Sequence, residues 1–395
     1  MYSKLMFDRS IYTQIDKYLD HDEAIVLTGP RRVGKTTTLR HFYDQIKSDN
    51  KIVLDLEDPL NRSIFDKINY EEIKQSFEQK GIGFNIKNYI FLDEIQFYKN
   101  IPSVMKYFHD HFNTKFFVTG SSSFYLKNLF SESMSGRKFL FEMYPLSFDE
   151  FLKFKEVKYQ PPNPKDKVSK TTYTLFQPFY EEYILYGGYP EVVLAKTIDE
   201  KNQKLRDIFT AYFQKEVLEL SDFRKDEEIR KLILLLTERV GQKLDIQKIS
   251  SEMGISRPTI LNFLEFLHGT YLIDLVPSFG KHGISARNQS KVYFIDTGLL
   301  NFLGKKEVGS IFENSIYLNL KKKEDVIRKI KYYEREGKEI DFIIDDLACE
   351  VKMFASNFDL KTLSNRSKKL KLEPGFVYSY RYSNISDVKY GFQTL

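Results

Sequence analysis

Apolar and polar positions along the first 155 residues follow the pattern of strands that alternate with helices. Short apolar runs are separated by stretches in which apolar residues recur with helical spacing. The four runs that predict buried strands are residues 24–28, 51–56, 89–92 and 116–119. The pattern is typical of an α/β protein with a parallel sheet.

The pattern changes twice further along the chain. Between residues 155 and 178, prolines and lysines replace the apolar periodicity, and residues 278–290 are rich in Gly, Ser and Asn. The segment between the two breaks has mainly helical spacing, and residues 291–395 mix short strands with helices. The sequence therefore predicts three domains: 1–155, 156–278 and 279–395.

Composition narrows the class of protein. A length of 395 residues fits two or three domains, and 42% hydrophobic with 29% charged residues excludes wholesale disorder. No apolar run approaches the length of a membrane helix, and the N-terminus has charges where a signal peptide is apolar. The single cysteine, Cys349, fits a reducing compartment. We therefore expect a cytoplasmic protein without a membrane partner.

Residues 29–36 read G-P-R-R-V-G-K-T, which fits the phosphate-loop pattern between a strand and a helix. Backbone N–H groups of such a loop wrap phosphates, its lysine neutralises β/γ charge, and its Thr reaches magnesium. The alternative, a chance Gly-rich turn, does not account for the strand before the loop and the helix after it. The sequence thus predicts ATP and Mg²⁺ as cofactors, held by Gly29, Arg32, Val33, Gly34, Lys35, Thr36 and Thr37.

Two acids follow the third apolar run. Asp93 is expected to hold magnesium together with Thr36, and Glu94 to orient or deprotonate the attacking water. The fourth run ends in Gly120 and three serines. Ser121 and its neighbours are interpreted either as polar sensors of the γ-phosphate or as caps of the next helix, and the two roles are compatible.

Several motifs occur in an order that resembles a known family. They are G-P-R-R-V-G-K-T, F-L-D-E-I-Q, T-G-S-S-S, S-G-R (135–137), P-L-S-F-x-E-F-L (145–152) and G-G-Y-P-E-V-V-L (187–194). The chain resembles prokaryotic AAA-superfamily ATPases in which the ATPase is joined to a winged helix and a C-terminal restriction-endonuclease-like domain of poorly known function.

The resemblance implies roles for two further segments. It makes Arg137 a candidate arginine finger, which acts on the ATP of a neighbouring copy and implies a homo-oligomer. It also places Pro190, in G-Y-P, near the nucleotide. From the residues alone, both segments are tight turns, and a purely structural role remains open for each.

Residues 246–275 have the pattern of two helices joined by a turn at Gly254 and followed by a strand. The second helix is expected to begin after Ser256 and to expose Ser256, Arg257, Thr259 and Asn262, which could touch DNA phosphates and bases. The segment carries few basic residues, so the alternative of a packing module stays open.

The last segment predicts a helix, three strands, a helix and a strand, with Glu313 opening the first helix. Asp341 precedes Glu350 by nine residues, and alternation places Glu350 and Lys352 on one face of their strand. Glu313, Asp341 and Glu350 are candidate metal ligands, and Lys352 a catalytic residue, for metal-assisted phosphodiester hydrolysis. The alternative is an exposed cross-strand pair worth under about 1 kcal/mol.

Taken together, the fold class expected is α/β. A P-loop AAA-type sheet is followed by a helical lid, a winged helix and an endonuclease-like α/β domain. The function expected is ATP binding and hydrolysis, as motor or switch, with a nuclease-like domain that acts on nucleic acid. The rival interpretation is an ATP-gated regulatory or scaffold protein whose C-terminal domain binds a partner without cleavage.

Overall fold

A computed structural model describes residues 7–67, 69–98, 100–121, 134, 136–220, 226–280, 289–304, 307–323, 326–327 and 329–393. The chain forms two compact units. The N-terminal unit consists of Asp8–Tyr144 with Gly269–Tyr271, and the C-terminal unit mainly of Pro145–His268 and Leu272–Leu395. Among the described residues, no helix is both long and apolar enough to cross a membrane.

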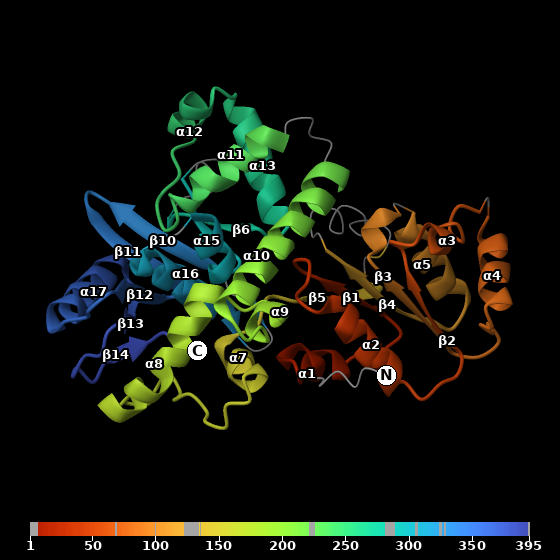
Figure 1. The fold of residues 1–395 in the computed structure, drawn as a ribbon, viewed down its shortest axis with the longest axis horizontal. Helices are drawn as coiled ribbons and strands as arrows, with labels where there is room; N and C mark the ends of the chain where they lie inside the picture. The colour runs from red at the N-terminus through yellow and green to blue at the C-terminus, as the bar shows by residue number, and fades with distance from the viewer. Residues whose placement is uncertain are drawn as a thin grey trace. The chain divides into compact units, whose positions relative to one another are not determined.

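The N-terminal unit is built on a five-stranded parallel sheet with the strand order β2-β3-β4-β1-β5 (Figure 1). Its strands are β1 (Ala24–Thr28), β2 (Lys51–Asp55), β3 (Asn88–Asp93), β4 (Thr114–Gly120) and β5 (Lys138–Glu142). Its helices are α1 (Ser10–Asp16), α2 (Lys35–Gln45), α3 (Pro59–Arg62), α4 (Tyr70–Gln79), the 3₁₀ turn η1 (Ile95–Phe97) and α5 (Ile101–His111). All four strands expected from apolar runs are present.

Alternation along β3 and β4 explains why both runs are apolar throughout. Phe91 and Phe117 stack with ring centroids 4.6 Å apart, and Phe117 lies 6.2 Å from Phe42 of α2. The residues that alternate with Phe91 in β3 and with Phe117 in β4 face the opposite side of the sheet. There they form one core with Phe77 of α4 and Phe108 of α5. Both faces are therefore covered, and each fully buried Phe contributes about 1.5–3 kcal/mol.

The C-terminal unit begins with helices. They are α7 (Phe148–Phe154), α8 (Lys170–Tyr186), α9 (Pro190–Val193), α10 (Ile198–Tyr212), the π-helix η2 (Phe213–Leu220) and α11 (Asp226–Thr237). The expected break at 155–178 is wrong at its far end. Ser169 caps α8 by accepting a hydrogen bond from Thr172 N–H, and the helix continues through Pro178.

The expected pair of helices around Gly254 is present. They are α12 (Ile246–Met253) and α13 (Arg257–Gly269), and Gly254 ends α12 with a φ of 67°. Ser256 Oγ accepts a hydrogen bond from Thr259 N–H at 3.3 Å, which caps α13 as predicted. The antiparallel pair β6 (Ile273–Val276) and β7 (Lys291–Phe294) follows.

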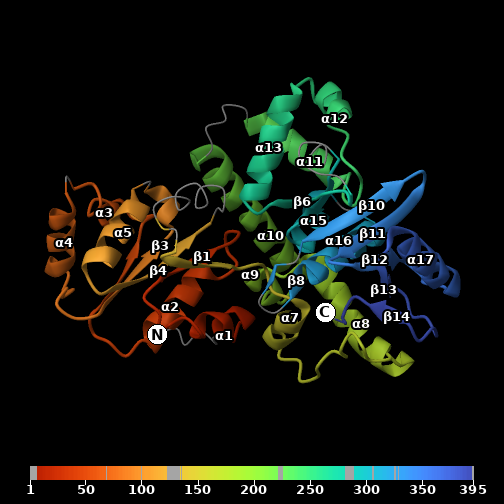
Figure 2. The same cartoon turned by 180° about the vertical axis from the view of Figure 1, so that it is seen from behind.

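A second five-stranded sheet, mixed rather than parallel, closes the chain (Figure 2). Its strands are β10 (Ile330–Arg335), β11 (Lys338–Ile344), β12 (Leu347–Lys352), β13 (Glu373–Ser379) and β14 (Val388–Tyr390), paired in that order. Before them come α15 (Thr297–Gly304), α16 (Val308–Lys321), β8 (Lys322–Lys323) and β9 (Val326–Ile327), and α17 (Asn357–Leu370) joins β12 to β13.

The order α16, β10, β11, β12, α17, β13 is the one expected from the sequence. The first two strand pairs are antiparallel and the pair of β12 with β13 is parallel. Residues of both the predicted middle and last domains contribute to one hydrophobic core. The division at residues 278/279 stays a prediction.

Candidate functional site

The loop between β1 and α2 has a backbone that glycine makes possible. Gly29 has a φ of 147°, and a Cβ there would lie 2.0 Å from the carbonyl oxygen of Met143. Arg32 and Gly34 also have positive φ, of 63° and 102°. Only glycine avoids both the clash and the strain at position 29. These backbone conformations let the loop turn closely around the start of α2.

Lys35 lies at the centre of this loop. Its side chain is 3% exposed, and Nζ donates hydrogen bonds to the carbonyl oxygens of Gly29 and Pro30, both at 2.9 Å. The carbonyl of Val33 accepts a hydrogen bond from Arg9 at 2.9 Å, while the exposed Thr37 follows in α2. The loop thus holds its lysine inward, and its backbone is braced from outside.

Asp93 ends β3 beside the loop and is 5% exposed. The hydroxyls of Thr119 and Thr36 both hydrogen-bond its carboxylate. Burial raises the pKa of Asp93, and the two hydroxyl contacts oppose that rise. The geometry therefore brings two hard oxygen donors, Thr36 and Asp93, together as expected.

Glu94 follows in the left-handed conformation, with a φ of 55°. Its N–H donates to Thr119 Oγ1 at 3.1 Å, which ties the turn to the end of β4. Burial alone would raise the pKa of Glu94, but the positive charges of Lys35 and Arg31, together with the hydrogen bonds from Gln96 and Ser121, outweigh it and lower the pKa. The carboxylate is therefore ionised at neutral pH.

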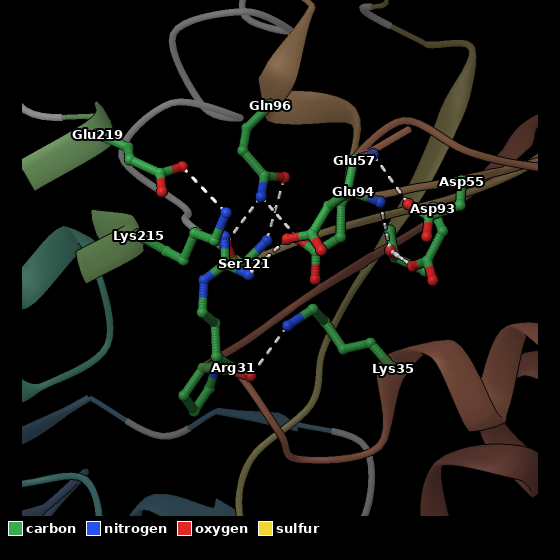
Figure 3. Close-up of polar contacts among 12 residues, drawn as sticks. Arg31, Lys35, Asp55, Glu57, Asp93, Glu94, Gln96, Ser121, Lys215 and Glu219 are labelled. Carbon is green, nitrogen blue, oxygen red and sulfur yellow. Dashed lines mark hydrogen bonds and ion pairs between the residues drawn. The ribbon is translucent and has the colours of Figure 1, made fainter. Parts of the chain in front are cut away.

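Gln96 is a contact that sequence reasoning missed. Its Nε2 lies 2.5 Å from Glu94 Oε2 and 2.8 Å from Ser121 Oγ, and its Oε1 accepts a hydrogen bond from Ser121 N–H at 3.3 Å (Figure 3). Gln96 was visible in the F-L-D-E-I-Q motif, where no role was attached to it. Arg31 was also missed, and its Nη1 lies 3.1 Å from Glu57 Oε1.

Of the expected sensor serines, only Ser121 lies within the described residues. Its side chain contacts Gln96 and also hydrogen-bonds Glu94, at the ends of β4 and β3. Ser122 and Ser123 lie outside the described residues, as does Ser135 of the S-G-R motif.

Arg137 is paired within its own unit. Its Nε lies 2.7 Å from Asp110 Oδ1, and its Nη2 lies 3.2 Å from Asp110 Oδ2. Such a two-pronged contact holds a guanidinium firmly. A role toward a neighbouring copy stays a prediction, and it would require this pair to open.

The G-Y-P segment starts α9 in the C-terminal unit. Gly188 N–H donates to Asp296 Oδ2 at 2.8 Å, and Asp296 also accepts from Leu299 N–H at 2.8 Å at the start of α15. The segment is therefore anchored to α15. That Pro190 lies near a nucleotide stays a prediction.

In the C-terminal unit, two of the expected carboxylates, Glu313 and Asp341, lie around a lysine that sequence reasoning did not find. Lys291 of β7 is 2% exposed, pairs with Glu339, and has its Nζ 4.0 Å from Glu313 Oε1. Burial alone would lower the pKa of Lys291, but Glu313, Asp341 and Glu339 outweigh it and raise the pKa. No motif connects a lysine fifty residues away with Asp341.

Glu313 and Asp341 interact with each other at this cluster. Burial, followed by the charge of Asp341, raises the pKa of Glu313, and burial also raises the pKa of Asp341. Tyr293 donates a hydrogen bond to Glu313 at 2.8 Å, and Val351 N–H donates to Asp341 at 2.8 Å. Glu313 lies in the second turn of α16 rather than opening it, so that expectation is corrected.

Glu350 is 3% exposed and has two cationic partners. Its Oε1 lies 2.7 Å from Arg366 Nη1 of α17, and its Oε2 lies 2.6 Å from Lys352 Nζ. The pair of Glu350 with Lys352 is therefore not an exposed one. In the part of the chain that the structure describes, no three Asp, Glu, His or Cys side chains are placed to hold a metal ion together.

The side chains expected on α13 are partly confirmed as exposed. Ser256, Arg257 and Asn262 are exposed, and Thr259 is half-buried. Ser256 Oγ and Thr259 Oγ1 lie 2.7 Å apart, so both hydroxyls serve the start of the helix.

Comparison with known proteins identifies the family. An uncharacterized protein of Methanocaldococcus jannaschii is 32% identical over 329 residues, which cover 81% of this chain and 71% of the relative. The chain belongs to the same protein family. An uncharacterized protein of Haemophilus influenzae is 28% identical over 358 residues, covering 86% of this chain and 84% of that protein.

Two family models divide the chain. An AAA domain matches residues 21–152, and a domain of unknown function (DUF8612) matches residues 177–309. The AAA match contains the phosphate loop, both acids and Arg137. The N-terminal unit is accordingly an AAA-type, nucleotide-binding ATPase domain.

Solved structures show weaker likeness. Thermotoga maritima RuvB aligns over 69% of this chain and 90% of its own, with 15% identity and a TM-score of 0.33. The ADP form of the Aeropyrum pernix ORC2 protein aligns over 70% of this chain and 88% of its own, with 12% identity and a TM-score of 0.34.

Proposed function

We propose that this AAA-domain protein binds ATP with Mg²⁺ between β1 and α2, hydrolyses it, and uses the cycle as a motor or switch for a C-terminal unit that acts on nucleic acid. The observation that carries the proposal is the meeting of Lys35, Asp93 and Glu94 within one unit, at the carboxyl ends of β1 and β3, which flank β4 in the parallel sheet.

Phosphate binding falls to the loop itself. Backbone N–H groups of Gly29, Arg32, Val33 and Gly34, followed by the start of α2 at Thr37, would surround the phosphates. Lys35 now bonds two loop carbonyls, and it would turn its ammonium to the β- and γ-phosphates. This exchange keeps a buried charge paired before and after ATP binds.

Thr36 and Asp93 fit a magnesium ion. Both offer oxygen, the donor that this ion prefers, and their side chains already share a hydrogen bond. When bound, the ion would neutralise charge between the β- and γ-phosphates. Residues of this chain then orient the reactants: Glu94 would accept a hydrogen bond from the attacking water, and Ser121 would respond to the γ-phosphate through Gln96.

Two substitutions test the ATPase. Lys35→Ala should abolish nucleotide binding measured by calorimetry, since the loop loses its ammonium. Glu94→Gln should retain binding and release phosphate far more slowly, because the amide binds no proton from the water. Wild-type turnover by Glu94→Gln would overturn the role given to Glu94.

A second function, metal-dependent phosphodiester cleavage, is favoured by the pair of Glu313 and Asp341. The pKa values of these two interacting carboxylates are both raised. A cation bound between them would stabilise their ionised forms. The order of elements from α16 to β13 also supports an endonuclease-like domain. Magnesium or manganese bound at Glu313, Asp341 and Glu350 would polarise the scissile phosphate. Because these three side chains are not placed to hold one ion together in the described structure, binding would have to bring them together.

Lys352 completes the proposed site. It pairs with Glu350, and Asp341 and Glu350 together raise the pKa of Lys352 even though burial alone would lower it. A charged Lys352 would contact the reacting phosphate. Ligation by Glu350 requires that it exchange part of its contact with Arg366 or Lys352 for the ion.

Cleavage of plasmid and branched DNA, with Mg²⁺ or Mn²⁺, separates this function from the scaffold alternative. The wild-type chain should cut, and Glu350→Ala should not. Equal persistence of DNA with both proteins, while ATP hydrolysis continues, would favour a partner-binding C-terminal unit.

A further inference from the structure

A cavity of about 760 Å³ lies in the C-terminal unit, between the two helices α12 and α13 and the β10–β11 hairpin. These elements can be followed in Figures 1 and 2. One side carries the exposed cations Lys243, before α12, and Arg257, at the start of α13. The hairpin side carries the acids Glu334 and Glu339. The volume is typical of a ligand-binding cavity.

The cavity adjoins the carboxylate cluster. Lys291 and Glu339 belong to both, and they form an ion pair with each other. Gly241 also lines the cavity, and a Cβ at this position would lie 2.7 Å from Glu313 Oε1. A ligand in the cavity would therefore lie next to the group of Glu313 and Asp341.

The lining suits a nucleotide. Lysine and arginine bind phosphate, and glutamine amides pair with base edges. Gln242, Gln247 and Gln289 supply three such amides, and Leu261 supplies apolar surface. A glutamate carboxylate, as at Glu334, accepts a hydrogen bond from a base amino group. Lys243 and Arg257 lie on the helix side together with Asp245, and Glu334 and Glu339 lie on the other side together with Lys291, the partner of Glu339. The helix side therefore has an excess of positive charge and the other side an excess of negative charge, which matches a ligand with a phosphate at one end and a base at the other.

The size excludes a duplex. A cube of 760 Å³ has an edge of about 9 Å, which is too narrow for a B-DNA duplex, whose major groove alone is about 12 Å wide. An unpaired nucleotide can enter such a space, as bases do when enzymes extrude them or act on single strands.

We propose that this cavity binds an unpaired nucleotide of a nucleic-acid strand, with its phosphate at Lys243 and Arg257, and directs the strand toward Glu313 and Asp341. The proposal rests on the nucleic-acid role in the proposed function and deepens it. It differs from duplex reading by α13, in which Arg257 would contact the major groove of paired DNA.

The test uses the full chain in EDTA, so that no strand is cut, with fluorescently labelled oligonucleotides. Single-stranded DNA, RNA of the same sequence and the DNA duplex are compared by anisotropy, and free mononucleotides are added as competitors. The cavity variant is Lys243→Ala with Arg257→Ala. Its control, Arg206→Ala with Lys248→Ala, removes the same charge from exposed positions of α10 and α12 that do not line the cavity.

We expect the wild-type chain to bind a single strand more tightly than the duplex. The cavity variant should weaken single-strand binding by about tenfold or more. It should also lower the slope of log affinity against log salt by about 0.7, the value for one phosphate contact on a single strand. The control should change affinity less than about twofold. Thermal unfolding of each variant checks that the chain is folded.

The possible outcomes distinguish failure of the cavity proposal from failure of the proposed nucleic-acid role. Tight single-strand binding that the cavity variant leaves unchanged would overturn the cavity alone. Absence of binding to all oligonucleotides would overturn the nucleic-acid role and the cavity together. If free mononucleotides compete at the same concentration as the oligonucleotide, the proposal that the cavity binds a nucleotide within a strand would be wrong. The DNA and RNA arms identify which strand is bound.

Discussion

The side-chain amide of Gln96 holds the carboxylate of Glu94, with Nε2 2.5 Å from Oε2, and the same nitrogen lies 2.8 Å from Ser121 Oγ. One amide therefore connects the end of β3 with the end of β4. A carboxylate that orients water must be held in place, and two neutral side chains, Gln96 and Ser121, hydrogen-bond that of Glu94.

We predict that Gln96→Ala lowers kcat for ATP hydrolysis by roughly tenfold, because small displacements of a positioning group have large effects on rate. Nucleotide affinity should change less than about twofold, since the contact is with Glu94 rather than with the phosphate loop. Phosphate release and nucleotide titration measure the two quantities. Gln79→Ala, at an exposed position of α4, is the control. Loss of affinity with unchanged kcat would contradict a positioning role.

Arg137, which pairs with Asp110 in its own unit, can be tested for a role at the ATP of a neighbouring copy. If Arg137 acts on a neighbouring copy, Arg137→Ala and Lys35→Ala are each inactive, but a mixture contains sites with both groups intact. Random mixing in equal amounts should restore roughly one quarter of the wild-type rate per site. Sedimentation should show an assembly under the same conditions. A monomer with concentration-independent activity per chain would rule this out.

Replacement of Asp341 should stabilise the chain. Its raised pKa means that the ionised carboxylate is less favourable in the folded than in the unfolded chain, so stability falls as pH rises through the folded pKa. Asp341→Asn removes this charge and keeps an acceptor for Val351 N–H. We expect Tm at pH 7.5 to rise by roughly 2–4 °C, about 1 kcal/mol.

The same variant reports on the metal site. Manganese should raise the Tm of the wild-type chain and have little effect on Asp341→Asn. Asp346→Asn, an exposed turn residue, is the control and should respond as the wild type does. An equal response to manganese in all three proteins would remove Asp341 from the metal site.

Asp296 should make stability depend on pH. Burial raises its pKa to about 6, against the hydrogen bonds from Gly188, Leu299 and Gly298. The contribution of Asp296 to the free energy of unfolding is fully present below about pH 4, the pKa of the residue in the unfolded chain. It is lost as the pH rises through 6, and the free energy of unfolding then falls by roughly 3 kcal/mol. Asp296→Asn lacks this change.

The measurement is the free energy of unfolding at pH 4 to 7. The free energy of unfolding of Asp296→Asn, relative to that of the wild type, should increase from pH 4 to pH 7. A difference that the substitution adds equally at every pH does not affect this comparison. Asp199→Asn, on the exposed side of α10, should run parallel to the wild type. Parallel curves for Asp296→Asn as well would show that Asp296 is not held in this way.

Periodicity and turn chemistry were sufficient for most of the elements. The buried strands of the N-terminal sheet, the turn at Gly254 and the order of strands after α16 follow from patterns within a few residues, because each pattern reflects local backbone geometry. The helix at Pro178 was missed because packing of α8 overrides the local cost of proline. The start of α16 was also misplaced, because the helix begins at Val308 rather than at Glu313.

The loop from Gly29 to Thr36, with Asp93 and Glu94, was predicted by the sequence alone, since its residues carry their chemistry at fixed local spacing. Contacts between distant residues were not. Gln96 with Ser121, Arg137 with Asp110, and Lys291 among Glu313, Asp341 and Glu339 are each separated by about 20 to 50 positions. Only the packing of whole strands and helices decides which side chains such elements bring together, because burial and charge act through space rather than along the chain.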